Sequence, residues 1–154
     1  MLFSTPPLEN DLVSLTPLIE ADFEKLFLVA SDQKIWEQHP VKDRYKQDVF
    51  KLYFDGALAS RTSYLIFEQQ HGQLIGCTRY YNYDPIGSKI AIGYTFLAKE
   101  YWGGIHNKAV KSLLIKHAFQ FVTAILFHVA KDNIRSQKAV LIMFTALSLK
   151  RKLL

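Results

Sequence analysis

Apolar and polar residues follow one another along the chain in patterns that predict an initial strand and then two helices. Residues 8–16 predict a strand, because apolar and polar side chains alternate there. Residues 19–30 and 43–58 each carry apolar side chains at helical spacing, which predicts two amphipathic helices. The connector 31–42 holds a dense set of polar and aromatic side chains, which makes this loop a candidate functional segment.

The middle of the chain predicts a strand meander, and the part after it predicts a strand–helix–strand unit. Three runs rich in β-branched and aromatic residues are predicted strands: 63–68, 73–83 and 89–97. A long amphipathic helix ending near Val122 follows, then an apolar strand over 124–130 and a final helix that Asn133 begins as its N-cap. This order predicts one α/β domain over residues 1–154, with a mixed sheet covered by helices on both faces.

Charge is distributed unevenly along the 154 residues. The chain is 49% hydrophobic and 21% charged with a net charge of +5, as expected for a folded protein. Residues 1–60 hold 6 basic and 10 acidic side chains, whereas residues 61–154 hold 13 basic and 4 acidic ones. A basic half favours an anionic partner: nucleic acid, anionic lipid or a phosphorylated small molecule. Because the basic residues are scattered and no nucleic-acid motif is present, we expect no nucleic-acid partner.

Cysteine usage and hydropathy exclude several classes of protein. Cys77 is the single cysteine, so no internal disulfide can form, and no Cys/His cluster has the spacing of a zinc site. No apolar stretch reaches the roughly 18–20 residues that a bilayer span requires. Residues 1–7 lack the basic and apolar regions of a secretory signal. We therefore expect a cytoplasmic protein with no metal and no membrane partner.

The segment from Leu97 to Lys108 predicts an anion site. Gly103 and Gly104 lead a predicted buried strand into a helix, and glycines let a ligand approach the backbone closely. The first N–H groups of a helix lack intrahelical partners and, with the helix dipole, suit a pyrophosphate. Plain turn chemistry is the alternative interpretation of the two glycines.

Five short motifs occur in a fixed order along the chain. They are 35–40 (Ile-Trp-Glu-Gln-His-Pro), 76–83, 92–97 (Ile-Gly-Tyr-Thr-Phe-Leu), 101–104 (Tyr-Trp-Gly-Gly) with Asn107, and Asn133-x-x-Ser136-x-x-Ala139. In this order and spacing, roughly residues 8–140 resemble the GNAT family of N-acetyltransferases. The resemblance is strongest to the branch that acetylates ribosomal-protein N-termini (RimJ/RimL type).

The resemblance implies a GNAT-like acyl-CoA N-acyltransferase fold and acetyl-CoA as co-substrate. The acetyl group would pass to a primary amine, either a peptide N-terminus or a small molecule, by direct attack in a ternary complex. The implied cofactor-binding residues are Thr95, Phe96, Leu97, Trp102, Gly103, Gly104, Ile105, His106, Asn107, Asn133 and Lys138.

The resemblance also implies residues for proton transfer and acceptor binding. Ser136 corresponds to a hydroxyl near the departing sulfur, where a hydrogen bond to the thiolate assists its departure. Glu37 or His39 would take the proton of the amine; a hydrogen bond that fixes the loop is the alternative for either. The implied acceptor-binding residues are Trp36, Tyr81 and Tyr83, for which burial in the core is the alternative.

Two departures from the family pattern bear on activity. Ala91 stands where many relatives carry an acidic residue. Residues 141–154 form an apolar run without the expected strands, so we expect an atypical or truncated C-terminus that lacks the last strands and allows a homodimer through an exposed patch. The alternative function is a catalytically impaired CoA-binding or interaction module. The acidic half carries the implied acceptor side, which predicts a cationic amine.

Overall fold

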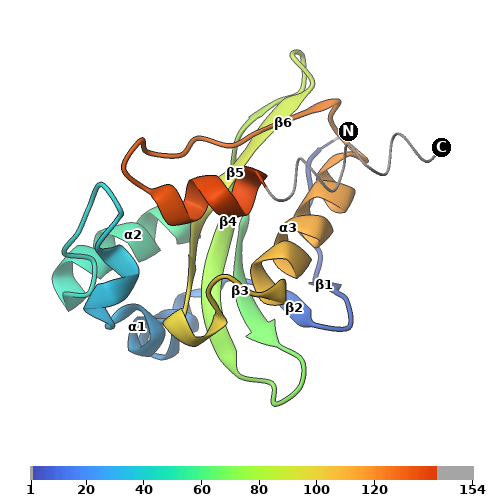
Figure 1. The fold of residues 1–154 in the computed structure, drawn as a ribbon. Helices are drawn as coiled ribbons and strands as arrows, with labels where there is room; N and C mark the ends of the chain where they lie inside the picture. Colours follow the sequence, from blue (N-terminus) through green and yellow to red (C-terminus); the bar gives the residue numbers. More distant parts are fainter. Residues whose placement is uncertain (1, 142–154) are drawn as a thin grey trace.

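The structure is a computed structural model that describes residues 2–141, and a six-stranded sheet is its central element (Figure 1). The strands are β1 (Leu8–Glu9), β2 (Val13–Pro17), β3 (Ser63–Glu68), β4 (Leu74–Asp84), β5 (Lys89–Leu97) and β6 (Ala124–Leu126). The helices are α1 (Phe23–Ala30), α2 (Gln47–Ser60) and α3 (Ile105–Ala118). Residues 134–141 are also helical, and short 3-10 turns span Glu20–Asp22, Gln33–Trp36 and Lys99–Tyr101.

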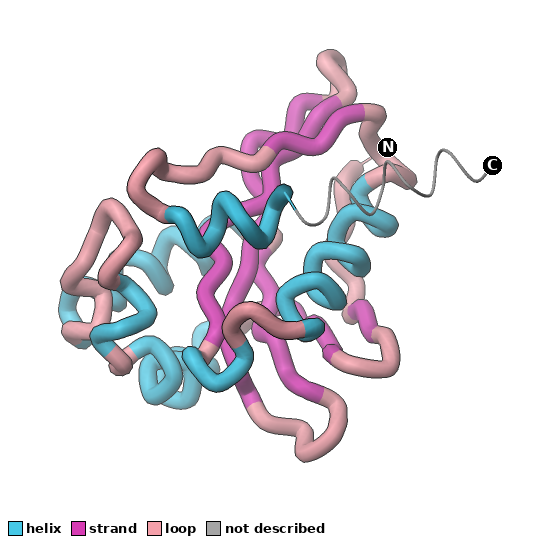
Figure 2. The backbone as a smooth tube through the Cα atoms, viewed as in Figure 1, coloured by secondary structure: helices cyan, strands magenta, loops and turns pink. Residues whose placement is uncertain are grey.

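The strands lie side by side in chain order from β1 to β6 (Figure 2). Every neighbouring pair from β1 to β5 is antiparallel; short turns connect β1–β2, β3–β4 and β4–β5, whereas α1 and α2 lie between β2 and β3. The pair β5–β6 is parallel, and α3 forms the crossover between its two strands. The predicted mixed sheet, with its meander and its strand–helix–strand unit, is therefore confirmed.

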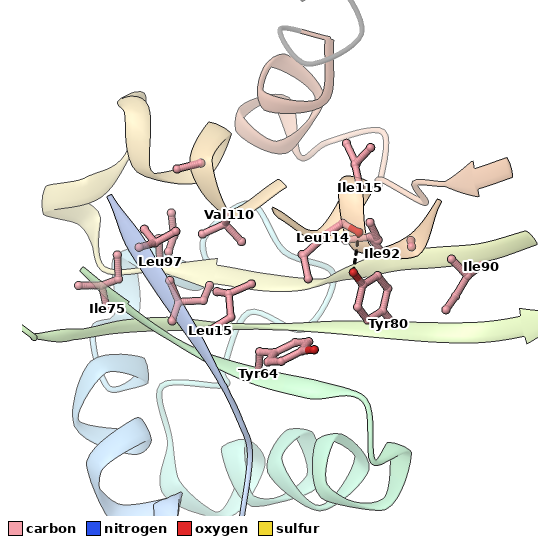
Figure 3. Close-up of a cluster of buried hydrophobic side chains, with 14 of the residues drawn as sticks. Leu15, Tyr64, Ile75, Tyr80, Ile90, Ile92, Leu97, Val110, Leu114 and Ile115 are labelled. Carbon is pink, nitrogen blue, oxygen red and sulfur yellow. Dashed lines mark hydrogen bonds between the residues drawn. The ribbon is translucent and has the colours of Figure 1, made fainter. Parts of the chain in front are cut away.

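One face of the sheet packs against α3. Tyr80 of β4 and Ile92 of β5 are buried there against Val110 and Leu114 of α3 (Figure 3). The Tyr80 hydroxyl donates a 2.6 Å hydrogen bond to the carbonyl oxygen of Leu114, which satisfies the only polar atom of that buried side chain. This contact fixes α3, and with it the loop that begins the helix, relative to β5.

The other face packs against α1 and α2. Trp36, Phe50 and Cys77 belong to its core, and the indole N–H of Trp36 donates a 2.7 Å hydrogen bond to the carbonyl of Ala30. Phe96 of β5 packs in the same cluster, with its ring centroid 5.0 Å from that of Trp36. The two helices therefore hold the C-terminal half of β5 from this side.

Three predicted boundaries are wrong, and local hydrogen bonds give the reasons. Residues 8–16 form two strands rather than one, because the Asn10 side-chain oxygen accepts the N–H groups of Leu12 and Val13 and turns the chain. The helix predicted over 43–58 spans Gln47–Ser60 instead, because the residues before it form a turn in which the N–H of Lys46 donates to the carbonyl of Asp43 at 3.0 Å. The helix predicted to end near Val122 ends as α3 at Ala118, where turn bonds replace helical ones.

Two further expectations concern the end of the chain. The strand predicted over 124–130 ends at Leu126, because β5 and the following segment separate there. The expected atypical tail lies almost entirely within residues 142–154, outside the described residues.

Candidate functional site

A cleft opens where β5 and the chain after β6 separate. The two strands pair only at Lys89–Ala91 with Ala124–Leu126. Beyond Ala91, β5 continues to Leu97 while residues 127–130 diverge from it, and a cleft of about 560 Å³ lies between these segments. A volume of this size suits a ligand of cofactor dimensions.

A β-bulge in β5 shapes one wall of the cleft. The β4–β5 register shifts between Cys77 and Arg79, and Tyr94 has a φ of +52° at this point. Gly93 permits the close approach of a side chain, because a Cβ there would lie 3.0 Å from Cε1 of Tyr81. The Tyr94 carbonyl accepts a hydrogen bond from the hydroxyl of Tyr53 on α2. The bulge is thus held in place from the α2 side.

The loop that precedes α3 closes one end of the cleft. Gly103 has a φ of +62°, a conformation that glycine adopts without strain, and Trp102 donates its indole N–H to the carbonyl of Leu97 at 2.8 Å. The side-chain oxygen of Asn107, one turn into α3, is buried without a hydrogen-bond partner. Lys111 lies one turn further along α3, where burial lowers its pKa to about 8.

The helix over 134–141 lies across the sheet between α2 and α3 (Figure 1). Asn133 caps it, since its side-chain oxygen accepts the N–H of Ser136 at 3.2 Å, as the sequence predicts. Arg135 stacks on the Trp102 ring with its guanidinium carbon 3.7 Å from the centroid, and its Nη2 donates to the carbonyl of Ile35 at 2.9 Å. Arg135 therefore connects the loop that precedes α3 to the segment that precedes α2.

The connector between α1 and α2 supplies the opposite wall. His39 packs edge-on against Trp36 with ring centroids 5.1 Å apart, and both His39 and Arg44 line the cleft. Burial, and then the charges of Arg44 and Arg135, lower the pKa of His39 to about 4. The imidazole is therefore neutral near pH 7.

Most of the residues implied by the resemblance come together in this cleft. Nine of the implied cofactor-binding residues line it: Thr95, Phe96, Leu97, Trp102, Gly103, Gly104, Asn107, Asn133 and Lys138. Ile105 and His106 do not; Ile105 is 58% exposed, and His106 packs against Tyr101.

The implied catalytic and acceptor residues separate into two groups. Ser136, His39 and Tyr81 line the cleft, whereas the exposed Glu37 does not. Trp36 has no exposed surface, which corresponds to the core alternative. Tyr83 packs beside Phe3 on the α3 face of the sheet.

His128 and Arg44 line the cleft, and the sequence motifs indicate no role for either. His128 interrupts the otherwise apolar run over 124–130, and this interruption is the signal that could have identified it. The Tyr81 hydroxyl and His128 Nδ1 are 2.7 Å apart in a hydrogen bond. Arg44 stands in a charged loop, and no local pattern distinguishes it.

The charge of the cleft wall is of one sign. Its basic side chains are those of Arg44, Lys108, Lys111, Arg135 and Lys138, and no Asp or Glu among residues 2–141 lines it.

No group of three or more His, Cys, Asp or Glu side chains among residues 2–141 is arranged to hold a metal ion. No helix in the described part of the chain is both long enough and apolar enough to cross a membrane.

Comparison with protein-family models identifies the family. The model of the acetyltransferase (GNAT) domain matches residues 13–141, which is most of the chain. No curated protein matches the chain. The matched residues include strands β2 to β6. They also include every segment that lines the cleft.

Solved structures with the same fold include three from bacteria. A GNAT-family protein from Chromobacterium violaceum is 21% identical over 89% of this chain and 72% of its own, with a TM-score of 0.78. RimJ from Mycobacterium smegmatis, in complex with CoA-disulfide, is 18% identical over 88% and 71%, with a TM-score of 0.63. Spermidine N-acetyltransferase from Vibrio cholerae, in complex with CoA and spermine, is 16% identical over 87% and 80%, with a TM-score of 0.63. At these identities, the likeness confirms the shared acyltransferase fold.

Proposed function

Because the chain belongs to the acetyltransferase (GNAT) domain family, we propose that it transfers the acetyl group of acetyl-CoA to a primary amine by direct attack in a ternary complex. The observation that carries this proposal is the cleft between β5 and residues 127–130. It brings together segments 93–97, 102–108 and 133–140, which are far apart in the sequence.

The cleft wall has donors and charges that suit the phosphates of CoA. The loop at Gly103 and Gly104 leads into the N-terminus of α3, where unpaired N–H groups and the helix dipole favour an anion. Lys108 and Lys138 line the cleft and add positive charge. Asn107, whose buried side-chain oxygen has no partner, offers a hydrogen-bond acceptor to a hydroxyl or amide of the cofactor.

The bulge in β5 suits the reacting thioester. Beyond Ala91, the edge of β5 toward residues 127–130 no longer pairs with β6, so its backbone groups can bond the pantetheine amides. A backbone N–H of 95–97 would polarise the thioester carbonyl, a role typically worth about 3–4 kcal/mol. Ser136 lines the same cleft, and we assign it the hydrogen bond to the departing thiolate.

The amine must lose a proton during the reaction, and the cleft offers two groups with different properties. An imidazolium at His39 would be a strong acid, because burial and two arginines disfavour its charge. We therefore assign His39 the role of a neutral hydrogen-bond acceptor that orients the amine. His128, which is exposed and bonded to Tyr81, can pass a proton to water. Glu37 lies outside the cleft wall and would have to act through water.

Two acceptor classes follow from the relatives. The resemblance of the motifs to the RimJ/RimL type supports a peptide N-terminus, and the likeness to the spermidine enzyme supports a small-molecule amine. The lining of the cleft itself favours neither size class.

Ligand-induced stabilisation and thiol release test the proposal. Acetyl-CoA at a concentration 100 times its Kd should raise stability by about 2.7 kcal/mol, measured as a higher Tm. Amine-dependent release of CoA thiol then distinguishes an enzyme from a non-catalytic CoA-binding module, which would show the Tm rise alone. No rise at millimolar acetyl-CoA would refute both functions.

Substitution of Ser136 tests its assigned role. Ser136→Ala should lower kcat about tenfold or more while leaving the Kd for acetyl-CoA within about twofold, since the hydroxyl acts on the developing thiolate. The matched control is Ser112→Ala, an exposed serine on α3 that does not line the cleft. An unchanged kcat in Ser136→Ala would remove Ser136 from the mechanism.

A further inference from the structure

Arg44 places an unneutralised guanidinium in the cleft wall. The side chain is half-buried, and its guanidinium carbon lies 5.6 Å from the ring centroid of Trp36 and 5.2 Å from that of Tyr53. Within residues 2–141, Arg44 forms no ion pair and no hydrogen bond. The two rings hold the flat group in place while its N–H donors remain available.

A second arginine, Arg79, lies near Arg44. Arg79 is 8% exposed, its guanidinium carbon lies 4.0 Å from the Tyr94 ring centroid, and Nη2 donates to the carbonyl of Tyr53 at 3.3 Å. Its Nε is buried without a hydrogen-bond partner. Burial lowers the pKa of Arg44, and the charge of Arg79 adds to this effect against the opposing effects of Tyr53, Tyr94 and the exposed Asp43, which forms no ion pair with Arg44. The two cations therefore lie close enough to repel each other.

Such a pair is costly without an anion. Burying a charge is unfavourable unless a partner compensates it, and like charges add to the cost. No carboxylate among the described residues lines the cleft. The phosphates of CoA would lie near the N-terminus of α3, which packs on the opposite face of the sheet from α2 (Figure 1). A counter-charge for Arg44 would therefore come from a ligand group other than the pyrophosphate.

We propose that the acceptor carries a carboxylate close to its amine, and that Arg44 binds this carboxylate. The inference rests on the proposed function and names the substrate class of the same site. Arginine pairs with a carboxylate through two parallel N–H···O bonds, which fixes the amine relative to the thioester as well as binding the acceptor. The carboxylate belongs either to a free amino acid or to an acidic residue at a peptide N-terminus.

Matched acceptors test the proposal on the unmodified protein. One arm compares free L-amino acids with their carboxamides, and the other compares Asp-Ala-amide with Asn-Ala-amide. In the arm that matches the true acceptor, the acid form should have at least about tenfold higher kcat/KM for thiol release, because hydrogen bonds to charged groups are the stronger ones. Equal kcat/KM for acid and neutral forms in both arms would overturn the proposal.

Variants of Arg44 then assign the preference to this side chain. Arg44→Gln should reduce the preference for the acid form to within about twofold, chiefly through a higher KM for the acceptor, and Arg44→Lys should restore part of it. The control Lys42→Gln removes an exposed charge two residues away, outside the cleft wall, and should keep the preference. An equal loss for acid and neutral acceptors in Arg44→Gln would assign Arg44 a structural role only and overturn the proposal.

Direct binding separates this inference from the proposed function. Calorimetric titration with N-acetylated amino acids, N-acetyl-Asp-Ala-amide and the corresponding neutral amides, with and without CoA, measures carboxylate recognition in the absence of turnover. Tighter binding of the acid form that Arg44→Gln abolishes supports the proposal even if no thiol is released. No Tm rise with acetyl-CoA would refute the proposed function, and equal binding of acid and amide would refute this inference alone.

Discussion

The pH dependence of stability should depend on His39. This imidazole packs against Trp36 in the cleft wall and faces the charges of Arg44 and Arg135. Its pKa in the folded chain is about 4, below the ordinary value of 6.5 expected in the unfolded chain. Between these two values, the unfolded state binds a proton that the folded state does not bind, so stability rises with pH in this window and falls as the pH is lowered through it.

The size of the effect follows from the interval between the two pKa values. About 2.5 pH units at about 1.4 kcal/mol each give a loss of about 3 kcal/mol once the pH has fallen to about 4. At pH 5 the loss already amounts to about 2 kcal/mol. Above pH 7 both states hold a neutral imidazole, and His39 contributes no pH dependence.

His39→Gln isolates this contribution, because glutamine is polar and does not titrate. The free energy of unfolding is measured by urea denaturation at pH 7 and pH 5 for both proteins. All other groups titrate in both proteins. The difference in free energy of unfolding between the original chain and the variant should therefore change by about 2 kcal/mol from pH 7 to pH 5, and the variant should lose less stability than the original chain. Arg44→Gln removes one of the repelling charges and should raise the pKa of His39 as followed by NMR.

Two results would contradict this reasoning. One is a His39 ring that titrates near 6.5 in the folded protein, which would mean that burial and the arginines do not act on it. The other is a stability difference between the original chain and His39→Gln that is the same at pH 7 and pH 5. Either result would also restore His39 as a candidate general base, because its imidazolium would then be a much weaker acid.

Two further predictions concern the cores on either side of the sheet. Tyr80→Phe removes the buried hydrogen bond to the Leu114 carbonyl and should lower the free energy of unfolding, measured by urea denaturation, by about 1–2 kcal/mol. Tyr64→Phe should cost less, because the carbonyl that its hydroxyl bonds belongs to the exposed Pro6 and can bond water instead. Equal costs would contradict this ranking. Burial raises the pKa of the Cys77 thiol to about 11. Cys77 should therefore react with a disulfide reagent only at the rate at which the protein opens. Rapid labelling of the folded chain would contradict this, because it would mean that the reagent reaches the α1–α2 core.

The strands, the glycine loop before α3 and the N-cap at Asn133 could be predicted because their signals are local. The β-rich runs at 63–68, 73–83 and 89–97 match β3, β4 and β5 closely. Gly103 and Asn133 act through their own backbone or an adjacent turn, so their sequence neighbours suffice to identify them. By contrast, the break at Asn10 depends on a side chain that bonds the backbone two and three residues later, and strand periodicity does not show it.

The acceptor side could not be predicted as well, because it depends on contacts between distant segments. Trp36 stands in a polar connector, yet its ring fills the space between Phe50 and Phe96, which only the folded chain brings together. The ring of Tyr53 and the charge of Arg79, which is 35 positions further along the chain, set the surroundings of the Arg44 guanidinium. No pattern around residue 44 carries this information.

The charge of the acceptor side shows the same limit in physical terms. The acidic half of the chain does supply one wall of the cleft, but its contribution there is His39, Pro40 and Arg44. Its carboxylates lie elsewhere: Asp22 and Asp55 pair with lysines on their own helical segments, and Asp32 pairs with Lys99. Their lysine partners compensate these charges, whereas the half-buried Arg44 has no ion-pair partner among the described residues and is screened less than an exposed charge. The sign of the field at the proposed acceptor position therefore follows from the half-buried Arg44 and the other basic side chains of the cleft rather than from the net charge of the segment, and the proposal above assigns the acceptor a carboxylate beside its amine.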